Sequence, residues 1–272
     1  MTQISVIIPT YKPKEYLQNC LNSLFDQTLE NKFYEVLLIL NGEKDPYFNY
    51  INELIGNKAN YRLFYCEENG VSKARNIGLE NSKSQNIVFI DDDDYVSKNY
   101  LEKLLSKKLK YPEASIIQSN FKVDLNTYIT EDYISKAYKD LKDTDYNLIR
   151  YRKFLSSVCG KLFDRSTINN NVFNESLGIA EDALFLFKIS KSINKMVLSS
   201  PSSVYYRRVR ENSIQTSKFS LKSEFKNYFK KIYLFSQIYL KEIFNYNLLF
   251  YLSRVFALTK VLLLRSSKVF KS

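Results

Sequence analysis

The stretch Asn86-Ile-Val-Phe-Ile-Asp-Asp-Asp-Asp94 decides how we interpret the rest of this sequence. Its apolar residues 87–90 form the short run that is typical of a strand buried on both faces, and four carboxylates follow at once. Side chains alternate along an extended chain, so we expect Asp91 and Asp93 to point the same way. Two carboxylates then meet just beyond the carboxyl end of a buried strand, where open α/β sheets usually bind ligands.

The acidic run is a candidate metal site. Four adjacent like charges repel one another, and a divalent cation is the simplest group that neutralises them. Mg²⁺ and Mn²⁺ prefer oxygen ligands, and Mg²⁺ commonly combines one or two carboxylates with water and substrate phosphates. A solvated acidic turn after a strand gives the same sequence, because acidic loops are common on protein surfaces.

Apolar runs of strand length alternate with amphipathic, helix-like segments over the first 121 residues. Ser72 and Ser97 stand where they can cap two of these helices, and Pro112 ends the second of them. Strands that alternate with helices predict an α/β, Rossmann-like fold with a mainly parallel central sheet and right-handed crossovers. The expected strands are residues 4–8, 35–40, 62–66, 87–90 and 115–121.

The second part of the chain is less regular. Residues 124–153 are polar and rich in Tyr, with no clear strand period; these rings can stack on sugars, although partial burial is the commoner role of Tyr. Asp182 begins a helical pattern, and the helix dipole favours a charged carboxylate there, as it does at any acidic helix start. A short strand at 204–206 leads into a loop, 207–213, with three arginines and a hydroxyl, a composition that suits a diphosphate and is also ordinary for a surface loop.

Charge is concentrated at the C-terminal end. After Ser217 there are eleven Lys and Arg residues against two acidic ones, which is most of the net charge of +11. The pattern there is helical, but Arg254 and Lys260 interrupt its last apolar segment, so we do not expect a membrane span. A basic amphipathic tail predicts peripheral contact with a bilayer or packing against a second subunit.

Composition limits the chemistry and the compartment. The three cysteines are far apart and odd in number, which favours reduced thiols in a cytoplasmic protein. The first ten residues lack a signal-peptide pattern, so we expect the protein in the cytoplasm, where the tail would place it at the inner face of the plasma membrane. There is no His, which excludes histidine metal ligands and histidine general bases.

Three segments together resemble family 2 glycosyltransferases, the inverting enzymes with the GT-A fold that assemble bacterial surface polysaccharides. They are Ser-Val-Ile-Ile-Pro-Thr-Tyr (5–11), Asn-Gly-Val-Ser-Lys-Ala-Arg-Asn-Ile-Gly (69–78) and Phe-Ile-Asp-Asp-Asp-Asp (89–94). The resemblance covers about residues 3–215. It implies a GT-A domain at 1–216, with a nucleotide-sugar-binding half (1–121) and an acceptor-binding half (122–216), followed by the basic helical tail at 217–272.

The resemblance also implies roles for individual residues. Asp93 would coordinate the metal on the donor diphosphate, and Asp91 would contact the ribose or the metal shell. Arg75 would lie near the base and phosphate. Glu181-Asp182 resembles the family's acidic pair, in which the Asp is the general base. The remaining expected donor-binding residues are Pro9, Thr10, Tyr11, Asn41, Asp92, Arg207 and Ser213.

The implied reaction is transfer of a sugar, with UDP-sugar as the expected donor, to a hydroxyl of a glycan or lipid-linked acceptor. Such transfer needs a cation (Mn²⁺ or Mg²⁺) to offset charge on the diphosphate and a carboxylate to accept the hydroxyl proton. Many family members carry Asp-Asp-Gly-Ser where this chain has Leu40-Asn-Gly-Glu43, so the nucleotide base stays open. The chain has no Trp, and so lacks the Gln-x-x-Arg-Trp motif of processive members; we therefore expect single additions.

Two other functions have to be weighed. A sugar-phosphate nucleotidyltransferase uses a similar sheet, but it usually has a Gly-rich phosphate loop after the first strand, where this chain has Pro9-Thr-Tyr-Lys-Pro13. A non-catalytic nucleic-acid-binding protein would explain the basic charge. That charge lies in an aliphatic, Tyr-rich helical tail, so we expect no nucleic-acid partner.

Overall fold

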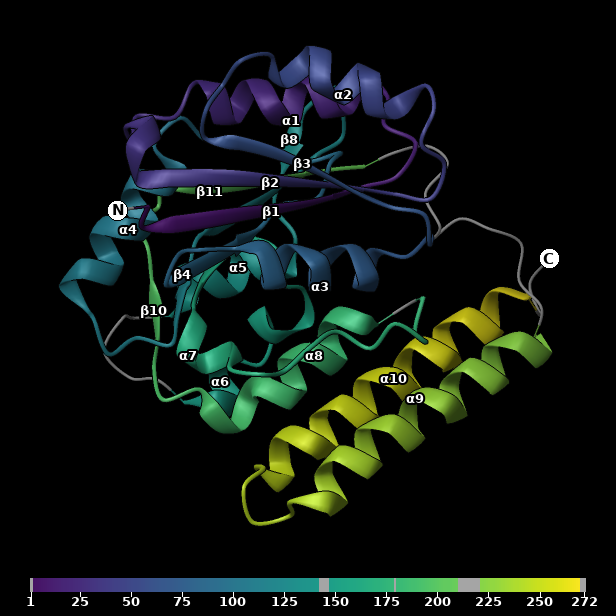
Figure 1. Ribbon diagram of the computed structural model, residues 1–272. Coiled ribbons are helices and arrows are strands. Elements are labelled where there is room, and N and C mark those ends of the chain that lie inside the picture. Colours follow the sequence, from purple (N-terminus) through teal and green to yellow (C-terminus); the bar gives the residue numbers. More distant parts are fainter. Residues whose placement is uncertain (1, 142–146, 179, 210–220, 270–272) are drawn as a thin grey trace.

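The computed structural model describes residues 2–141, 147–178, 180–209 and 221–269. Its centre is a seven-stranded sheet with helices on both faces (Figure 1). From one edge to the other, the strands are β10 (Met196–Leu198), β6 (Ile116–Gln118), β9 (Lys161–Asp164), β4 (Asn86–Phe89), β1 (Ile4–Thr10), β2 (Tyr34–Asn41) and β3 (Tyr61–Cys66).

The predicted mainly parallel sheet is confirmed. Strands β3, β2, β1 and β4 run parallel to one another, and β10 runs parallel to β6. The exception is β9, which lies antiparallel between β4 and β6. Strands β1 and β2 are buried along their whole length, which explains their continuous apolar sequence.

Helices cover the two faces of this sheet, with α1 (Glu15–Phe25) and α2 (Tyr47–Ile55) on one side and α3 (Val71–Asn81) on the other (Figure 1). Helix α3 approaches β1 very closely at Gly78, where an added Cβ would lie 2.4 Å from Ile7 Cγ2. Only glycine permits this packing. Since α3 carries Arg75, this contact fixes the depth at which that side chain enters the protein.

Both expected helix caps, Ser72 and Ser97, are wrong. Helix α3 begins at Val71 with Gly70 before it, so Ser72 lies inside the first turn with its hydroxyl buried. Helix α4 (Tyr100–Lys110) follows Asn99, whereas the Ser97 hydroxyl accepts a hydrogen bond from Val204 N and donates to Ser202 O. Ser97 therefore joins two segments instead of capping the helix.

The single strand expected at 115–121 is also wrong, because it is two strands in different sheets. The break is at Ser119, whose hydroxyl, like the amide of Gln118, donates to Gly160 O. Strand β6 stays in the large sheet, and the chain then enters a four-stranded sheet. In that sheet the order is β5 (Tyr95–Val96), β11 (Val204–Arg208), β7 (Asn120–Asp124) and β8 (Ile129–Thr130).

The remaining elements complete the body of the protein. The polar segment 124–153, where no strand period is visible, contains β8 and two helices. The elements not yet introduced are α5 (Tyr133–Asp140), α6 (Leu148–Tyr151), α7 (Arg165–Ile168), α8 (Glu181–Ile189) and the short 3₁₀ helices η1 (Asn31–Phe33), η2 (Phe154–Ser156) and η3 (Ser190–Ser192).

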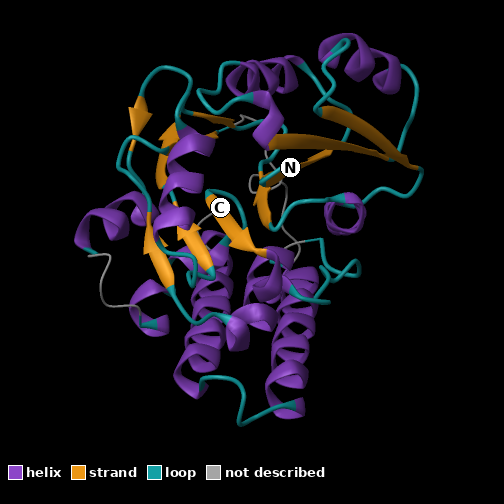
Figure 2. Cartoon of the chain, turned by 60° about the vertical axis from the view of Figure 1, so that its left-hand side comes forward, coloured by secondary structure: helices purple, strands orange, loops and turns teal. Residues whose placement is uncertain are grey.

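The C-terminal helical extension is confirmed as a hairpin of α9 (Leu221–Lys241) and α10 (Leu248–Val269). In Figure 2 it projects below the strands. It packs on α8, where the Phe187 ring meets Phe235, Tyr246 and Phe250. Among the described residues, no helix has both the length and the apolar character that a bilayer span requires. The boundary predicted at 216/217 lies outside the described residues.

Candidate active site

The acidic run forms a turn at the carboxyl end of β4. Asp94 N donates to Asp91 O at 3.1 Å, so the chain reverses instead of staying extended as expected. Asp91 and Asp93 nevertheless lie together, and Asp94 joins them: the three side chains each offer a carboxylate oxygen, and these oxygens lie within 4.8 Å of one another. The donor set is all oxygen and negatively charged, which fits Mg²⁺ or Mn²⁺.

Asp94 is the buried member of this cluster and was not among the expected site residues. Its Oδ2 accepts from Tyr205 Oη at 2.6 Å and its Oδ1 from Arg208 N at 2.8 Å. Burial, together with the charges of Asp93 and Asp91, raises the pKa of Asp94 well above its usual range. Tyr205 Oη also accepts from Asp91 N at 3.2 Å, so one buried tyrosine fixes both ends of the acidic turn.

Arg75 joins the acidic turn to the pair at the start of α8. The side chain is 3% exposed, and its Nη2 lies 2.9 Å from Asp91 Oδ1. Nη1 lies 2.6 Å from Asp182 Oδ1 and 3.6 Å from Glu181 Oε1. Burial alone lowers the pKa of Arg75, but the carboxylates of Asp182, Asp91 and Glu181 outweigh it and raise the pKa above its usual value.

Asp182 is held on both oxygens. Oδ1 pairs with Arg75, and Oδ2 accepts from Val158 N at 3.0 Å. Both members of the acidic pair lie in the first turn of α8, as the helical pattern predicted, and their side chains are mostly buried. Burial and the neighbouring Asp182 raise the pKa of Glu181. The two carboxylates therefore differ in environment, although they are adjacent in sequence.

A buried lysine supports the loop that holds Asp182. Lys161 Nζ donates to Ser157 O at 2.7 Å and to Cys159 O at 3.1 Å, on either side of Val158. Burial lowers the pKa of Lys161 to about 8, although the charge of Asp182 acts in the opposite direction. Sequence reasoning missed Lys161, and the Cys-Gly-Lys-Leu-Phe pattern at 159–163 gives no sign of its role.

The residues expected to hold the nucleotide gather at the carboxyl ends of β1 and β2. Pro9 and Thr10 are buried at the end of β1, and Thr10 Oγ1 donates to Asp92 Oδ2 at 3.1 Å. Tyr11 follows and is about half exposed. Asn41, at the end of β2, donates to Thr10 O at 2.7 Å and accepts from Gly70 N at 2.9 Å. The side chain of Asn41 thus ties both strand ends to the loop before α3.

Residues 5–171 match the family described as glycosyl transferase family 2. The chain belongs to this family. It is 28% identical over 261 residues to an uncharacterized glycosyltransferase of Haemophilus influenzae, covering 91% of this chain and 96% of that one. It is 27% identical over 231 residues to the poly(ribitol-phosphate) beta-N-acetylglucosaminyltransferase TarS of Staphylococcus aureus, covering 83% of this chain but only 39% of TarS.

The glycosyltransferase also shares its fold with a solved structure. Residues 1–349 of S. aureus TarS in complex with UDP-GlcNAc superpose with a TM-score of 0.73 at 23% identity, covering 88% of this chain and 67% of that one. The GT-A fold expected from the resemblance is thereby confirmed. The roles of the individual site residues stay predictions.

The loop after β11 is only partly described. Arg207, with its side chain 42% exposed, has Nη2 3.8 Å from Asp132 Oδ2. The expected diphosphate-binding Ser213 lies outside the described residues, as do the other residues of the loop from 210 onward. The structure therefore places the start of this segment near the acidic turn, through the bond from Arg208 N to Asp94.

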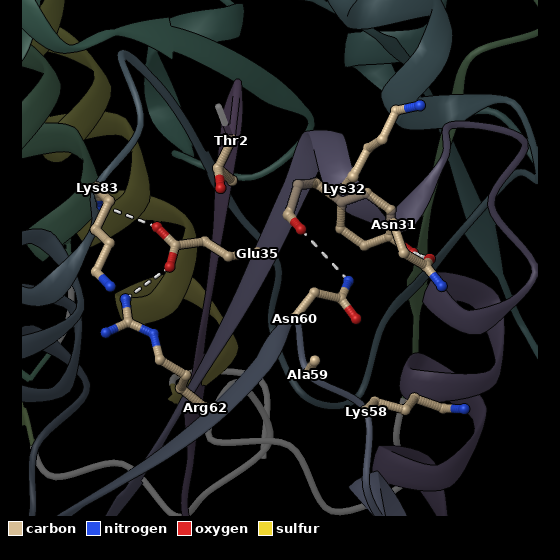
Figure 3. Close-up of a pocket in the computed structure, with 10 residues that line it drawn as sticks. Thr2, Asn31, Lys32, Glu35, Lys58, Ala59, Asn60, Arg62 and Lys83 are labelled. Carbon is tan, nitrogen blue, oxygen red and sulfur yellow. Dashed lines mark hydrogen bonds and ion pairs between the residues drawn. The ribbon is translucent and has the colours of Figure 1, made fainter.

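An open cavity on the surface of the transferase lies at the end of the sheet opposite to the expected donor site. It has a volume of about 460 Å³ and is lined by residues at the amino ends of the strands, including Thr2, Glu35 and Arg62 (Figure 3). Glu35 Oε2 pairs there with Arg62 Nη2 at 2.6 Å, and its Oε1 accepts from Lys83 N at 2.8 Å. The carboxylates of the candidate active site lie at the opposite, carboxyl ends.

Proposed function

We propose that this transferase moves a sugar from a UDP-linked donor to a hydroxyl of an acceptor glycan or lipid-linked saccharide, with inversion, in the synthesis of a bacterial surface polysaccharide. The observation that carries the proposal is the bridge formed by Arg75. It joins a three-carboxylate cluster suited to a divalent cation to the carboxylate best placed to act as a base. The similarity to the poly(ribitol-phosphate) beta-N-acetylglucosaminyltransferase TarS, and to the structure of its complex with UDP-GlcNAc, supports the proposed donor and acceptor class.

Asp91 and Asp93, with Asp94 behind them, would hold the divalent cation. When bound, Mn²⁺ or Mg²⁺ offsets the charge that builds up on the departing diphosphate. The chain's own contribution is to keep the turn fixed. Tyr205 donates to Asp94 and accepts from Asp91 N, so the carboxylates keep one arrangement before the donor arrives.

Asp182 would accept the proton of the acceptor hydroxyl. As that proton moves to the Asp182 carboxylate, the acceptor oxygen forms a bond to the anomeric carbon, and the bond from that carbon to the diphosphate oxygen breaks on the opposite side. This single displacement inverts the anomeric centre. Arg75 and Val158 N hold the carboxylate in one orientation, which is what a positioned base requires.

The test is a screen of nucleotide-sugars with and without Mn²⁺ or Mg²⁺. UDP-GlcNAc, UDP-glucose, UDP-galactose and GDP-mannose are each incubated with the protein and with polyol-phosphate or lipid-linked acceptors. We expect metal-dependent release of UDP and a product whose anomeric configuration, read by NMR, is opposite to that of the donor. Formation of UDP-sugar and pyrophosphate from UTP and a sugar 1-phosphate would instead identify a nucleotidyltransferase and overturn the proposal.

Two further proposals concern the surroundings of the reaction. The expected place of action is the inner face of the plasma membrane, because a lipid-linked acceptor would be presented there. A nucleic-acid partner is not expected, since the basic residues of the C-terminal hairpin are interleaved with exposed apolar side chains. Action at the membrane requires a surface of the protein that binds the bilayer.

A further inference from the structure

The α9–α10 hairpin has an apolar surface that faces away from the rest of the protein. We name it the outer face. It consists of Phe225, Phe229, Tyr233 and Leu240 on α9 and Leu249, Leu252, Phe256 and Leu263 on α10, with Ile243 and Phe244 at the tip.

Helical spacing shows that these side chains form one surface. On each helix they recur at intervals of three, four or seven residues, which places them on one stripe at about 100° per residue. The buried residues of the same helices lie on another side: Phe235 and Tyr239 on α9, and Phe250 and Arg254 on α10. Tyr239 of α9 stacks on Tyr251 of α10, and this contact forms the seam between the two helices. The stripes of α9 and α10 therefore flank this seam on the side that points outward.

The exposure of the outer face is large for a surface that only contacts water. Phe229 is 63% exposed, Phe256 71% and Phe244 97%. Single exposed apolar residues are ordinary, but a contiguous group of large ones marks an interaction site.

Lysines border the outer face along its length. Viewed along the helix axis, Lys226 and Lys241 lie on the side of α9 next to its apolar stripe, and Lys260 lies next to the stripe of α10. All three side chains are exposed. The two acidic residues of the hairpin are already paired, Glu224 with Arg265 and Glu242 with Lys191. An apolar stripe bordered by exposed cationic side chains is the arrangement of helices that lie in the interface of an anionic bilayer.

We propose that the outer face docks on the surface of an anionic lipid bilayer, with the apolar stripes entering the headgroup region and the lysines contacting lipid phosphates. A second copy of this chain is a poorer occupant. Two-fold pairing of the outer faces would bring lysine borders of like charge together, and opposite charges to offset them are not available on the described part of the hairpin. Anionic headgroups supply that charge.

The hairpin also connects this surface to the acidic pair. On the flank of α9, beside its apolar stripe, Lys230 Nζ donates to Ser176 O, in the segment before α8, at 2.6 Å. Lys231 lies within electrostatic range of Glu181. One helix, about 10 Å across, therefore separates the outer face from the segment that carries Asp182. If the proposed function holds, a docked bilayer would place a lipid-linked acceptor within reach of the base.

Flotation of the full chain with vesicles tests the proposal. Vesicles of phosphatidylglycerol and phosphatidylcholine in equal parts are compared with pure phosphatidylcholine, at low and at high salt. We expect flotation with the anionic vesicles at low salt. The double variant Phe229→Ser/Phe256→Ser should lower the bound fraction at least about tenfold, since two exposed aromatic side chains no longer enter the lipid. Lys226→Gln/Lys241→Gln should lower it several-fold on anionic vesicles.

A matched control lies on α4, far from the hairpin. Leu109 is 68% exposed, so Leu109→Ser removes a comparable apolar side chain, and it should float like the unaltered protein. Circular dichroism confirms that each variant is folded. The measurement needs no catalysis, so its outcome is independent of the proposed reaction.

Two results would overturn the proposal. One is flotation of the Phe229→Ser/Phe256→Ser variant equal to that of the unaltered protein. The other is lack of binding to anionic vesicles together with a dimer in light scattering that the same double variant converts to a monomer. In the second case a second copy covers the outer face.

Discussion

Arg75 Nη1 lies 2.6 Å from Asp182 Oδ1 while Nη2 of the same guanidinium lies 2.9 Å from Asp91 Oδ1. One buried cation thus connects two carboxylates, Asp91 and Asp182, that are far apart in the sequence, and sets the distance between the two functional ends of the site. Only a planar fork with several donors can make both contacts, so arginine is not exchangeable with lysine here.

We therefore expect Arg75→Lys and Arg75→Ala to abolish transfer, and Arg75→Ala to lower the free energy of unfolding by about 3–5 kcal/mol, because carboxylates are left buried without their partner. Urea denaturation measures the second effect. Arg62, whose side chain is 31% exposed and pairs with Glu35, is the matched control. Arg62→Ala should cost much less. Equal losses for the two variants would show that Arg75 is an ordinary ion-pair residue.

The carboxylate cluster of the acidic turn leads us to predict that donor binding depends on a divalent metal ion. Asp93→Ala removes one of three clustered carboxylates and should abolish the Mn²⁺-dependent part of UDP binding in calorimetry. Thermal unfolding without metal should change little or even improve, because removing one carboxylate relieves repulsion within the cluster. Undiminished metal-dependent binding by Asp93→Ala would falsify its role as a ligand.

The close packing at Gly78 leads us to predict that a larger residue there destabilises the fold. Gly78→Ala would place a methyl 2.4 Å from Ile7 Cγ2 and 3.1 Å from Ile39 Cδ1, so α3 has to move away from the sheet. We expect the free energy of unfolding to fall by about 1–3 kcal/mol. Transfer should also slow, because α3 carries Arg75. At Gly178 an added Cβ has open space. Gly178→Ala should leave stability nearly unchanged, and a similar loss at both positions would contradict the packing argument.

The parts of the fold that could be predicted are those written in local patterns. Strands β1, β2 and β4 are continuous apolar runs, and the alternation with helices predicted a parallel sheet. The reversed strand β9 was not predicted, because the direction of a strand leaves no mark in its periodicity. Helix α2 was also missed, although Phe48, Ile51 and Ile55 have helical spacing.

The residues of the candidate site also fall into those that a local motif revealed and those that it did not. The resemblance supplied Arg75, Asp91, Asp93 and the acidic pair, since these lie in short motifs. Asp94, Tyr205 and Lys161 act through contacts across the fold, and their neighbours in sequence do not reveal those contacts. Asp91 and Asp93 do lie together, as their alternation in sequence predicted, but a turn and not an extended strand gathers the carboxylates.

The lowered pKa of Lys161 leads us to predict how the stability of the fold depends on pH. Its pKa is about 8 in the folded protein, against a usual value of 10.5. Below about 8 the folded state carries a buried charge; between about 8 and 10.5 it loses its proton while the unfolded state keeps one. The stability of the unaltered protein relative to Lys161→Met should therefore rise with pH across this window and be constant at neutral pH. Urea denaturation in a pH series measures it.

A kinetic readout separates positioning by Lys161 from a purely structural role. Lys161→Met releases the carbonyls of Ser157 and Cys159, so Val158 N can move away from Asp182. Turnover should fall about 10- to 100-fold while donor affinity stays unchanged. The exposed Lys110 on α4 is the control: Lys110→Met should alter neither the pH series nor turnover.

The most decisive substitution is Asp182→Asn, compared with Glu181→Gln. Asn keeps the size of the side chain but cannot accept the acceptor proton, so turnover should fall by about 10²- to 10⁴-fold. Donor affinity in calorimetry should barely change, because the lost interaction belongs to the transition state. The amide has one cost that can be foreseen: if its oxygen faces Arg75, its NH₂ faces Val158 N–H, so a modest loss of thermal stability accompanies the substitution.

Glu181→Gln should act differently, because Glu181 lies 3.6 Å from Arg75 Nη1 against 2.6 Å for Asp182, and burial already favours its neutral form by raising its pKa. A neutral glutamine resembles that form, so turnover should fall far less than in Asp182→Asn. If Asp182→Asn keeps near-normal turnover while Glu181→Gln does not, the base is Glu181. If neither variant slows transfer while Asp93→Ala still abolishes metal-dependent binding, the donor site is correct and the proton leaves by another route.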